Sequence, residues 1–196
     1  AAGYATYKVL SQETNLSPIS MAGHSLGEYT ALVASSAMSF FDAIQLVRKR
    51  GELMQAAVPT GTGSMAAILG LEDTLIIAIC QKASNQGVVE AVNFNSPGQV
   101  VIAGEKNAVA HACELMKEAG AKRALVLPVS VPSHCSLMKD AAGKFKTYIE
   151  FVDLKAGNVK VIHNVDADYA GDIKDIKAKL VEQLHMPVLW ASSVNK

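Results

Sequence analysis

Apolar residues recur along the chain with the two periods that distinguish helices from strands. A helical period predicts a helix from about Phe41 to Ala57, which follows a capping box formed by Ser39 and Asp42. Its apolar face consists of Ala43, Leu46, Val47, Leu53, Met54 and Ala57. Short apolar runs at residues 18–22 and 159–165 predict buried strands. Because predicted helices and strands alternate along the chain, the sequence indicates an α/β fold.

The middle of the chain predicts a separate unit. Its pattern gives a strand, a helix, two strands joined by a turn at Ser96-Pro97-Gly98, a second helix and a last strand. The predicted ranges are 64–71, 73–86, 88–95, 99–104, 106–120 and 122–128. This βαββαβ order is that of a ferredoxin-like subdomain. We therefore expect a ferredoxin-like subdomain at 61–128, inserted into a core domain made of residues 1–60 and 129–196.

The segment Gly23-His24-Ser25-Leu26-Gly27 has the G-x-S-x-G pattern of a nucleophile elbow, in which a serine stands on a sharp turn between a strand and a helix. The predicted strand at 18–22 and a helix at about 26–36 flank it as that geometry requires. Ser25 is therefore a candidate nucleophile, and the N–H of Leu26 is a candidate donor to an oxyanion. We expect both glycines to be needed, because the turn brings backbone atoms close together.

Arg50 falls near the middle of the apolar face of the helix predicted at 41–57. A guanidinium is rarely buried without an anionic partner, because losing its hydration is costly. It could pair with a buried carboxylate, extend an aliphatic stem past the core to water, or bind an anionic substrate. Periodicity alone leaves these alternatives open.

A serine nucleophile needs a base, and His134 is the best candidate because it follows Pro132 and Ser133 on a constrained loop between predicted elements. An ordinary structural histidine remains the alternative from this position alone. Possible acidic partners of its ring are Asp140, Asp153 and Asp166. The other histidines are expected elsewhere: His24 pointing away from Ser25, His163 within a strand, and His111 and His185 on the surface.

Asn93 and Asn95 are two residues apart, so they share one face of a predicted strand. The simplest explanation of Asn95 is that it starts the following turn. Asn93 has no such explanation, and it is a candidate substrate-binding residue.

Composition excludes several classes of protein. Half of the 196 residues are hydrophobic, and 18 basic residues balance 18 acidic ones without a basic cluster, which gives no support for nucleic-acid binding. No apolar run reaches the ~20 residues of a membrane span. The three cysteines lack metal-binding spacing and favour reduced thiols in a cytoplasmic protein. We therefore expect no membrane, nucleic-acid, metal or cofactor binding.

Four segments together resemble the malonyl-CoA:acyl carrier protein transacylases of bacterial type II fatty acid synthesis. They are G-H-S-L-G-E-Y from Gly23, R-G-E-L-M from Arg50, N-F-N-S-P-G-Q-V-V-I-A-G from Asn93 and V-P-S-H-C-S-L-M from Val131. The resemblance implies an α/β-hydrolase-like core with an inserted ferredoxin-like subdomain, in agreement with the pattern above.

The resemblance also implies a reaction. Ser25 would accept the malonyl group of malonyl-CoA, His134 would act as general base and acid, and Arg50 would bind the free malonyl carboxylate. The partner that receives the malonyl group is the phosphopantetheine thiol of acyl carrier protein. Leu26 N–H would help to hold the oxyanion, and no cofactor takes part.

Two departures from the family affect this expectation. A Gly-Gln-Gly segment near the N-terminus, which contributes a glutamine to the oxyanion site, and a C-terminal stretch that helps orient the histidine have no counterpart here. We therefore expect a fragment lacking both termini and poorly active in isolation. The runner-up function is a serine esterase or thioesterase with the same elbow, and a catalytically idle module that docks carrier proteins is a third interpretation.

Overall fold

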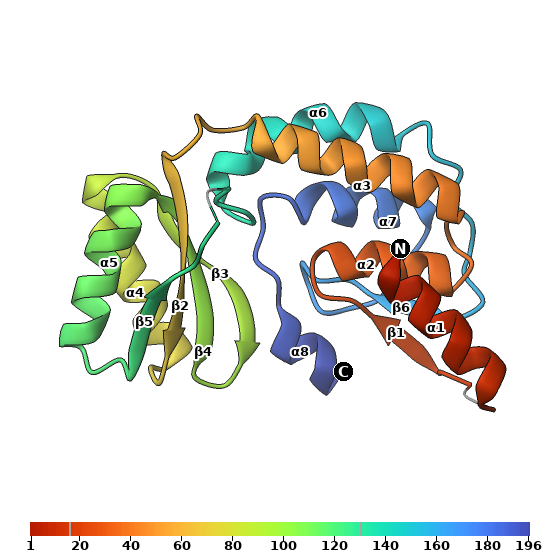
Figure 1. The fold of residues 1–196 in the computed structure, drawn as a ribbon, viewed down its shortest axis with the longest axis horizontal. Helices are drawn as coiled ribbons and strands as arrows, with labels where there is room; N and C mark the ends of the chain where they lie inside the picture. Colours follow the sequence, from red (N-terminus) through yellow and green to blue (C-terminus); the bar gives the residue numbers. More distant parts are fainter. Residues whose placement is uncertain (16, 130) are drawn as a thin grey trace.

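The computed structural model describes residues 1–15, 17–129 and 131–196, so Leu16 and Ser130 of the expected core domain lie outside it. The helices and strands alternate along the chain, which confirms the predicted α/β class (Figure 1). In chain order they are α1 (Ala2–Glu13), β1 (Ser20–Ala22), α2 (Leu26–Ala34), α3 (Phe40–Gln55), β2 (Gly63–Leu69), α4 (Asp73–Ala83), β3 (Val89–Ser96), β4 (Gln99–Glu105), α5 (Lys106–Glu118), β5 (Arg123–Val126), α6 (Lys139–Ile149), β6 (Lys160–Ile162), α7 (Ile173–Glu182) and α8 (Trp190–Asn195). Short 3₁₀ turns cover Ser84–Gln86 (η1) and Ser136–Met138 (η2).

One end of the molecule is a four-stranded antiparallel sheet with the strand order β3-β4-β2-β5. Helices α4 and α5 cover one face of this sheet (Figure 1). Fully buried residues such as Ile68, Ile76 and Ile102 fill the layer between sheet and helices. The predicted order of strand, helix, two strands, helix and strand is confirmed, although α4 ends at Ala83 and a 3₁₀ turn continues to Gln86.

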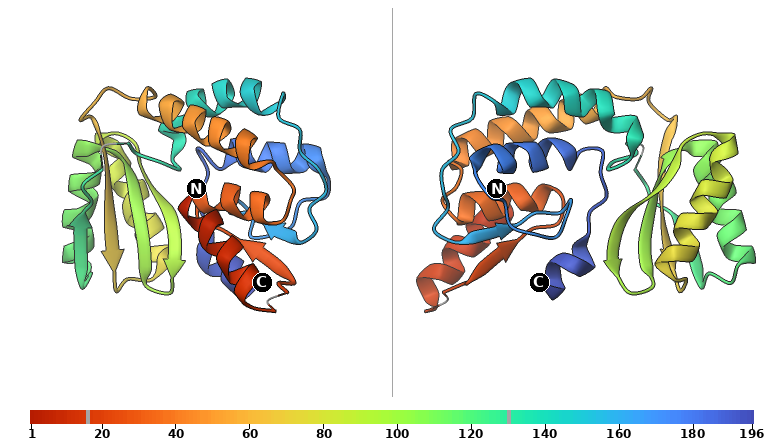
Figure 2. Two further views of the ribbon diagram at one scale, coloured as in Figure 1. Left: turned by 45° about the vertical axis from the view of Figure 1, so that its right-hand side comes forward. Right: turned by 180° about the vertical axis from the view of Figure 1, so that it is seen from behind.

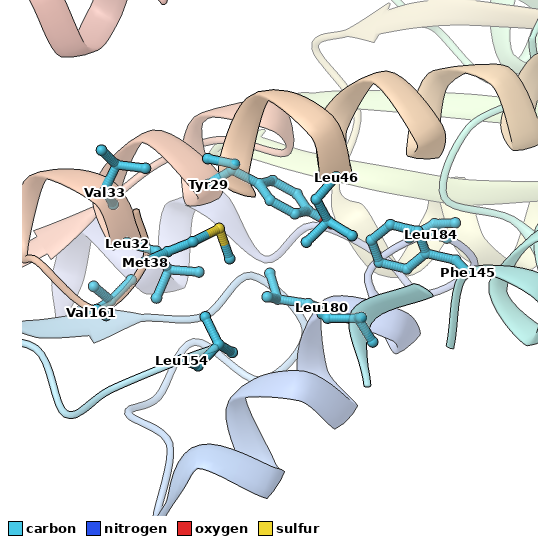
Figure 3. Packing of buried hydrophobic residues seen from close by; sticks show 14 of the residues in the cluster. Tyr29, Leu32, Val33, Met38, Leu46, Phe145, Leu154, Val161, Leu180 and Leu184 are labelled. Carbon is cyan, nitrogen blue, oxygen red and sulfur yellow. The ribbon is translucent and has the colours of Figure 1, made fainter. Parts of the chain in front are cut away.

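The other end is built around a two-stranded parallel sheet, in which Met21 of β1 pairs with Val161 of β6. Helices α2, α3, α6 and α7 pack beside these strands, and Leu46, Phe145 and Leu180 lie in the core between them (Figure 3). On α3 the buried residues are Ala43, Leu46, Arg50 and Met54. The predicted apolar face of this helix is therefore confirmed, with Arg50 inside it.

The capping box before α3 is also confirmed. Ser39 Oγ accepts a hydrogen bond of 3.0 Å from the N–H of Asp42, and the Ser39 hydroxyl donates to the Asp42 carboxylate at 2.6 Å. The box satisfies one of the free N–H groups in the first turn, which fixes where α3 begins. Its start matters because Arg50 lies on this helix.

A sharp turn joins β1 to α2, and Ser25 has φ 50° and ψ −108° there. A Cβ at Gly23 would stand 2.0 Å from the carbonyl carbon and oxygen of Gly27, so only glycine fits at position 23. A Cβ at Gly27 would meet no atom within 4 Å. The prediction that the turn needs both glycines is correct for Gly23 and wrong for Gly27.

Two elements are shorter than their patterns predict. The strand predicted at 159–165 ends at Ile162, so His163 lies just beyond β6 instead of within a strand. The His163 N–H donates to the carbonyl of Asp168 at 2.9 Å, which turns the chain there. The helix predicted at 173–185 ends at Glu182, which leaves Gln183 free to take part in other contacts.

The segment between α7 and α8 runs from the core to the edge of the four-stranded sheet (Figures 1 and 2). Val188 accepts from the N–H of Phe94 at 3.0 Å and donates to the carbonyl of Val92 at 2.8 Å, both on β3. The next residue, Leu189, donates to the carbonyl of Asn164 at 2.8 Å. These bonds fix β3 relative to the loop that follows β6.

His111 and His185 are both half-buried, so the expectation that they lie on the surface is met only in part. Within the described ranges, no helix combines the length and apolar character needed to cross a membrane.

Candidate functional site

The fold brings together Ser25 and His134, which are 109 residues apart in the sequence. Ser25 precedes the first residue of α2, and His134 lies in the loop before η2. Ser25 Oγ and His134 Nε2 are 2.8 Å apart, and the histidine side chain is only 3% exposed. This is the separation that a hydroxyl nucleophile and its base require.

The second ring nitrogen of His134 determines its protonation. Nδ1 lies 2.6 Å from the carbonyl oxygen of Gln183, and because a carbonyl only accepts, Nδ1 carries the hydrogen. In the neutral ring, Nε2 is then free to accept the proton of Ser25. The carbonyl of Gln183 therefore orients the ring of His134. The expectation that the stretch orienting this histidine has no counterpart in the chain is wrong for this contact.

Among the residues that the structure describes, no aspartate orients the ring of His134. None of Asp140, Asp153 and Asp166 makes a hydrogen bond or ion pair with His134 among the contacts that the described ranges contain, and Asp166 instead pairs with Lys179 at 2.8 Å. The backbone carbonyl of Gln183 orients the ring instead, and unlike an aspartate it places no negative charge beside His134.

The surroundings of His134 favour its neutral form. Burial is the main cause that lowers its pKa to about 3, with further lowering by the positive charge of Arg50 and by the neighbouring His24, and an opposing effect of the bond to Gln183. The residue has a φ of 67°, and its N–H donates to the carbonyl of Leu184 at 3.0 Å. Near pH 7 the imidazole is thus uncharged and able to accept a proton.

The loop that carries His134 is also attached to the four-stranded sheet. Glu90 of β3 accepts from the N–H of Ser136 at 3.0 Å and from its hydroxyl at 2.5 Å. Cys135, between the two, is fully buried. The base is therefore fixed from both sides, by α7 through Gln183 and by β3 through Glu90.

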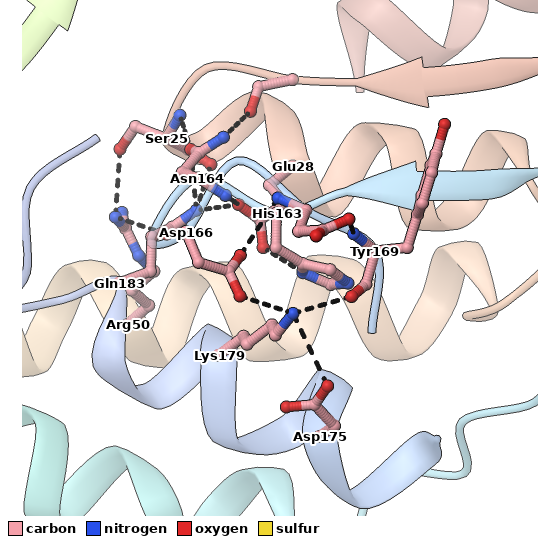
Figure 4. Close-up of polar contacts among 12 residues, drawn as sticks. Ser25, Glu28, Arg50, His163, Asn164, Asp166, Tyr169, Asp175, Lys179 and Gln183 are labelled. Atoms are coloured by element: carbon pink, nitrogen blue, oxygen red, sulfur yellow. Dashed lines mark hydrogen bonds and ion pairs between the residues drawn. The ribbon is translucent and has the colours of Figure 1, made fainter. Parts of the chain in front are cut away.

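Arg50 reaches the same site from α3 and is 7% exposed. Its Nη2 donates to Ser25 Oγ at 3.1 Å and to Gln183 Oε1 at 3.2 Å, while its buried Nε has no hydrogen-bond partner among the described residues (Figure 4). No salt bridge joins Arg50 to a carboxylate in residues 1–15, 17–129 and 131–196. The ion-pair alternative is therefore wrong, and the low exposure contradicts a side chain that extends to water.

Leu26 occupies the first position of α2, directly after Ser25. Its N–H has no acceptor among the hydrogen bonds of the described residues. The free N–H groups of a first helical turn carry the positive end of the helix dipole. A donor is thus available beside the Ser25 hydroxyl, where the sequence predicts one.

Three buried residues that the sequence reasoning did not single out connect these side chains: Glu28, Asn164 and Gln183 (Figure 4). Asn164 Oδ1 accepts from the N–H of Ser25 at 2.7 Å, and Gln183 Nε2 lies 3.0 Å from the Ser25 carbonyl. Glu28 could have been found, because a residue three positions after the nucleophile lies on the same side of the helix. Asn164 follows a strand whose partner leads to the elbow. Gln183 carries no comparable signal.

The asparagines differ from expectation. The pairing of β3 with β4 is irregular between Ala91 and Asn93 and again between Phe94 and Ser96, which places Asn95 in a bulge. Asn95 Oδ1 accepts from His24 Nε2 at 2.8 Å, so starting a turn is an incomplete explanation of this residue. His24 also packs edge-on against Trp190, with ring centroids 5.5 Å apart.

His24 makes no hydrogen bond with Ser25 in the described part of the chain, as expected, although it contributes to the lowered pKa of His134. The Asn93 side chain is 5% exposed and, within the same residues, makes no hydrogen bond to Ser25, His134 or Arg50. Substrate binding by Asn93 stays a prediction. The described residues contain no group of three or more His, Cys, Asp or Glu side chains that could hold a metal ion.

Comparison with known proteins gives consistent matches. The malonyl CoA-acyl carrier protein transacylase of Haemophilus influenzae is 52% identical over 197 residues, which cover 100% of this chain and 63% of that protein. An acyl-carrier-protein S-malonyltransferase from Burkholderia pseudomallei is 53% identical, with a TM-score of 0.96 over 99% of this chain and 63% of that one.

A third relative is a malonyl-transacylase solved in complex with a type II PKS acyl-carrier protein, which is 48% identical with a TM-score of 0.96 over 99% of this chain and 63% of that one. The chain thus spans 63% of the length of each of these relatives. The family model described as the acyl transferase domain matches residues 3–185. This chain therefore belongs to the acyl transferase domain family.

Proposed function

We propose that the site transfers a malonyl group from malonyl-CoA to the phosphopantetheine thiol of an acyl carrier protein, as a step of fatty acid biosynthesis. The observation that carries the proposal is the convergence on Ser25 Oγ of His134 Nε2 at 2.8 Å and Arg50 Nη2 at 3.1 Å. A serine and a base make an acyl acceptor, and the buried cation beside them selects an acyl group that carries its own anion.

In the first half of the reaction, the Ser25 hydroxyl transfers its proton to His134 Nε2 while Oγ attacks the thioester carbonyl carbon. The carbonyl oxygen becomes an oxyanion, and Leu26 N–H donates to it. The bond between carbon and sulfur then breaks, and His134 returns the proton to the leaving thiolate of CoA. A malonyl ester of Ser25 remains.

In the second half, the thiol of the carrier protein gives its proton to His134 and attacks the ester. The serine oxygen leaves with that proton, and the malonyl thioester of the carrier protein is released. The complex of a 48% identical malonyl-transacylase with an acyl-carrier protein supports this choice of acceptor.

Arg50 provides the selectivity. A malonyl carboxylate fits a planar guanidinium through two parallel hydrogen bonds, and the unpartnered Nε offers one of the donors. An acetyl group would leave this buried donor unsatisfied. Hydrogen bonds to charged groups contribute about 1.5–3 kcal/mol, which corresponds to roughly a 10- to 150-fold preference.

We also propose the finer description of the fold. The parallel pair β1–β6 with α2, α3, α6 and α7 forms an α/β-hydrolase-like core at 1–60 and 129–196, and residues 61–128 form a ferredoxin-like subdomain. The strand order β3-β4-β2-β5 supports the second assignment. With this division, α2, α3 and α7 contribute Ser25, Arg50 and Gln183, and the linker that follows the subdomain contributes His134.

A cytoplasmic location is part of the proposal. Cys80, Cys113 and Cys135 are all buried and free, and burial raises the pKa of Cys80 and of Cys135 to about 12. Such thiols suit a reducing compartment.

The experiment that tests the proposal distinguishes transfer from hydrolysis. The protein is incubated with malonyl-CoA and a carrier protein that bears phosphopantetheine, and the products are measured by mass spectrometry. We expect a malonyl thioester on the carrier, which disappears with Ser25→Ala. The release of malonate and free CoA without carrier labelling would instead support the serine esterase or thioesterase function.

A further inference from the structure

One fully buried carboxylate contacts the two side chains, Asn164 and Gln183, that bind the reacting groups. Glu28 is 0% exposed and lies on α2, one turn after Ser25. Its Oε1 accepts from His163 Nδ1 at 2.8 Å, and its Oε2 accepts from the N–H of Asn164 and from Gln183 Nε2, both at 2.9 Å (Figure 4). The reaction described above assigns no task to this group.

Two of the partners of Glu28, Asn164 and Gln183, connect it to the reacting groups. Asn164, fixed by its N–H, uses its side chain to accept from Ser25 N–H at 2.7 Å and to donate to the carbonyl of Gly23 at 2.9 Å. Both contacts hold the backbone of the elbow, where Ser25 adopts a positive φ. The turn that exposes the nucleophile is therefore tied to Glu28 through one side chain.

Gln183 connects Glu28 to the other two groups. Its side-chain oxygen accepts from Arg50 Nη2 at 3.2 Å, and its backbone carbonyl accepts from His134 Nδ1 at 2.6 Å. Because the amide nitrogen of Gln183 is bound to Glu28, its oxygen must face Arg50. The orientation of the Gln183 amide therefore helps to position the guanidinium of Arg50.

The chemistry of the donors fixes the identity of the residue. Oxygens of an ionised carboxylate only accept, and the groups facing Glu28 all donate. A glutamine in its place would direct its own NH₂ either toward Asn164 N–H and Gln183 Nε2, which both donate, or toward His163 Nδ1, which would then have to give up its hydrogen to Nε2. Burying a carboxylate without hydrogen bonds costs free energy. The carboxylate of Glu28 therefore restrains its three donors, because moving any of them away would leave it unsatisfied.

We propose that Glu28 is the positioning residue that keeps the nucleophile, the base and the carboxylate-binding arginine in register. This inference rests on the proposed malonyl transfer for the role of Arg50, and on geometry alone for Ser25 and His134. Displacement of a reacting group by about 1 Å lowers a rate by about 10²-fold. We expect Glu28→Gln to slow acylation of Ser25 by that factor.

The test uses two readouts. The first is the rate at which Ser25 reacts with a fluorophosphonate probe, which needs Ser25 and His134 and carries no carboxylate for Arg50 to bind. The second is the ratio of malonyl to acetyl adduct formed from the two CoA esters. Glu182→Gln, an exposed change of the same kind beside Gln183, is the matched control. A packing variant, Phe145→Leu, serves for comparison at an equal loss of thermal stability.

We expect Glu28→Gln to lower the probe rate about 10²-fold and the malonyl preference together, and Phe145→Leu to change neither by more than a few-fold. If Glu28 acts through Gln183, its effect on the malonyl preference is not additive with that of Gln183→Ala. If Glu28→Gln does not fold, Glu28→Asp retains the charge but shortens the reach, and an intermediate loss is expected.

Losses no greater than those of the stability-matched Phe145→Leu, or effects that add with those of Gln183→Ala, would overturn the inference. A protein that reacts with the probe but takes no malonyl group would contradict the proposed function instead. The probe rate of Glu28→Gln would still decide the positioning of Ser25 and His134.

Discussion

Arg50 Nη2 donates a hydrogen bond to Ser25 Oγ at 3.1 Å, although Ser25 lies on the turn before α2 and Arg50 lies on α3, 25 positions later. Ser25 Oγ thus accepts from a cation while it donates to His134 Nε2 at 2.8 Å. A malonyl carboxylate that bound Arg50, as proposed above, would compete for the same donor and free a lone pair of Ser25 Oγ. In the proposed reaction, binding of the malonyl carboxylate and the reactivity of Ser25 would therefore be coupled through Arg50.

Removal of the guanidinium tests this coupling. Arg50→Ala is expected to slow malonyl transfer to Ser25 by roughly 10- to 150-fold, the equivalent of a hydrogen bond to a charged group. Acetyl transfer should not fall, because an acetyl group has no carboxylate to bind Arg50, so the preference for malonyl disappears. Arg48→Ala is the matched control, since Arg48 lies on the same helix but is 77% exposed and pairs with Glu52. Retention of full malonyl preference in Arg50→Ala contradicts the assigned role.

The pH dependence of serine acylation follows from the environment of His134. Because burial lowers the pKa of this histidine from the ordinary 6.5 to about 3, the base stays neutral at pH values well below 6.5. We expect the rate in the free protein to be nearly constant between pH 5 and about pH 7. The charge of Arg50 contributes to the lowered pKa, so Arg50→Ala should move the acidic decline to higher pH. A decline centred near pH 6.5 in the unsubstituted protein would contradict this account.

Much of this arrangement could be predicted from local patterns. The elbow, the capping box and the buried face of α3 depend on residues close together in the sequence, and each is present. The proximity of Ser25 and His134 in the fold could be predicted from residue types, because a hydroxyl nucleophile needs a base.

The supporting contacts could not be predicted in the same way. Gln183 acts through a backbone carbonyl that any residue would supply, and its side chain acts only because α7 ends one residue earlier. The bulge that turns Asn95 toward His24 arises from pairing between strands and leaves no mark in the sequence of β3. Gly27 also lies in the expected motif, yet a side chain at Gly27 would meet no atom within 4 Å. A side chain at Gly23, in contrast, would collide with the backbone of Gly27.

Stability should also depend on His134. Its pKa is lower in the folded protein than the ordinary 6.5, so below pH 6.5 the unfolded chain binds a proton that the folded chain does not. This contribution is complete above pH 6.5 and is lost as the pH falls toward about 3, by up to about 1.4 kcal/mol per pH unit. Urea denaturation from pH 7 to pH 4 should show a steeper loss for the unsubstituted protein than for His134→Asn. Equal slopes would show that the histidine is not kept neutral by the fold.

The two glycines of the elbow provide a paired test of the turn. Gly23→Ala places a methyl group 2.0 Å from the backbone of Gly27, which must displace α2 or prevent folding. Gly27→Ala meets no atom within 4 Å and replaces glycine in the first turn of a helix, so it should be neutral or stabilising by up to about 1 kcal/mol. Thermal unfolding of both variants measures the difference. Equal destabilisation by the two substitutions would be inconsistent with the structure of this turn.

The most direct test of the central claim is the intact mass of the protein after brief incubation with malonyl-CoA, with acetyl-CoA and Ser25→Ala as controls. We predict an increase equal to one malonyl group, little acetyl adduct, and no adduct on Ser25→Ala. An adduct that persists in Ser25→Ala, or acetylation as rapid as malonylation, would contradict the account in which Ser25 receives an acyl group selected by Arg50.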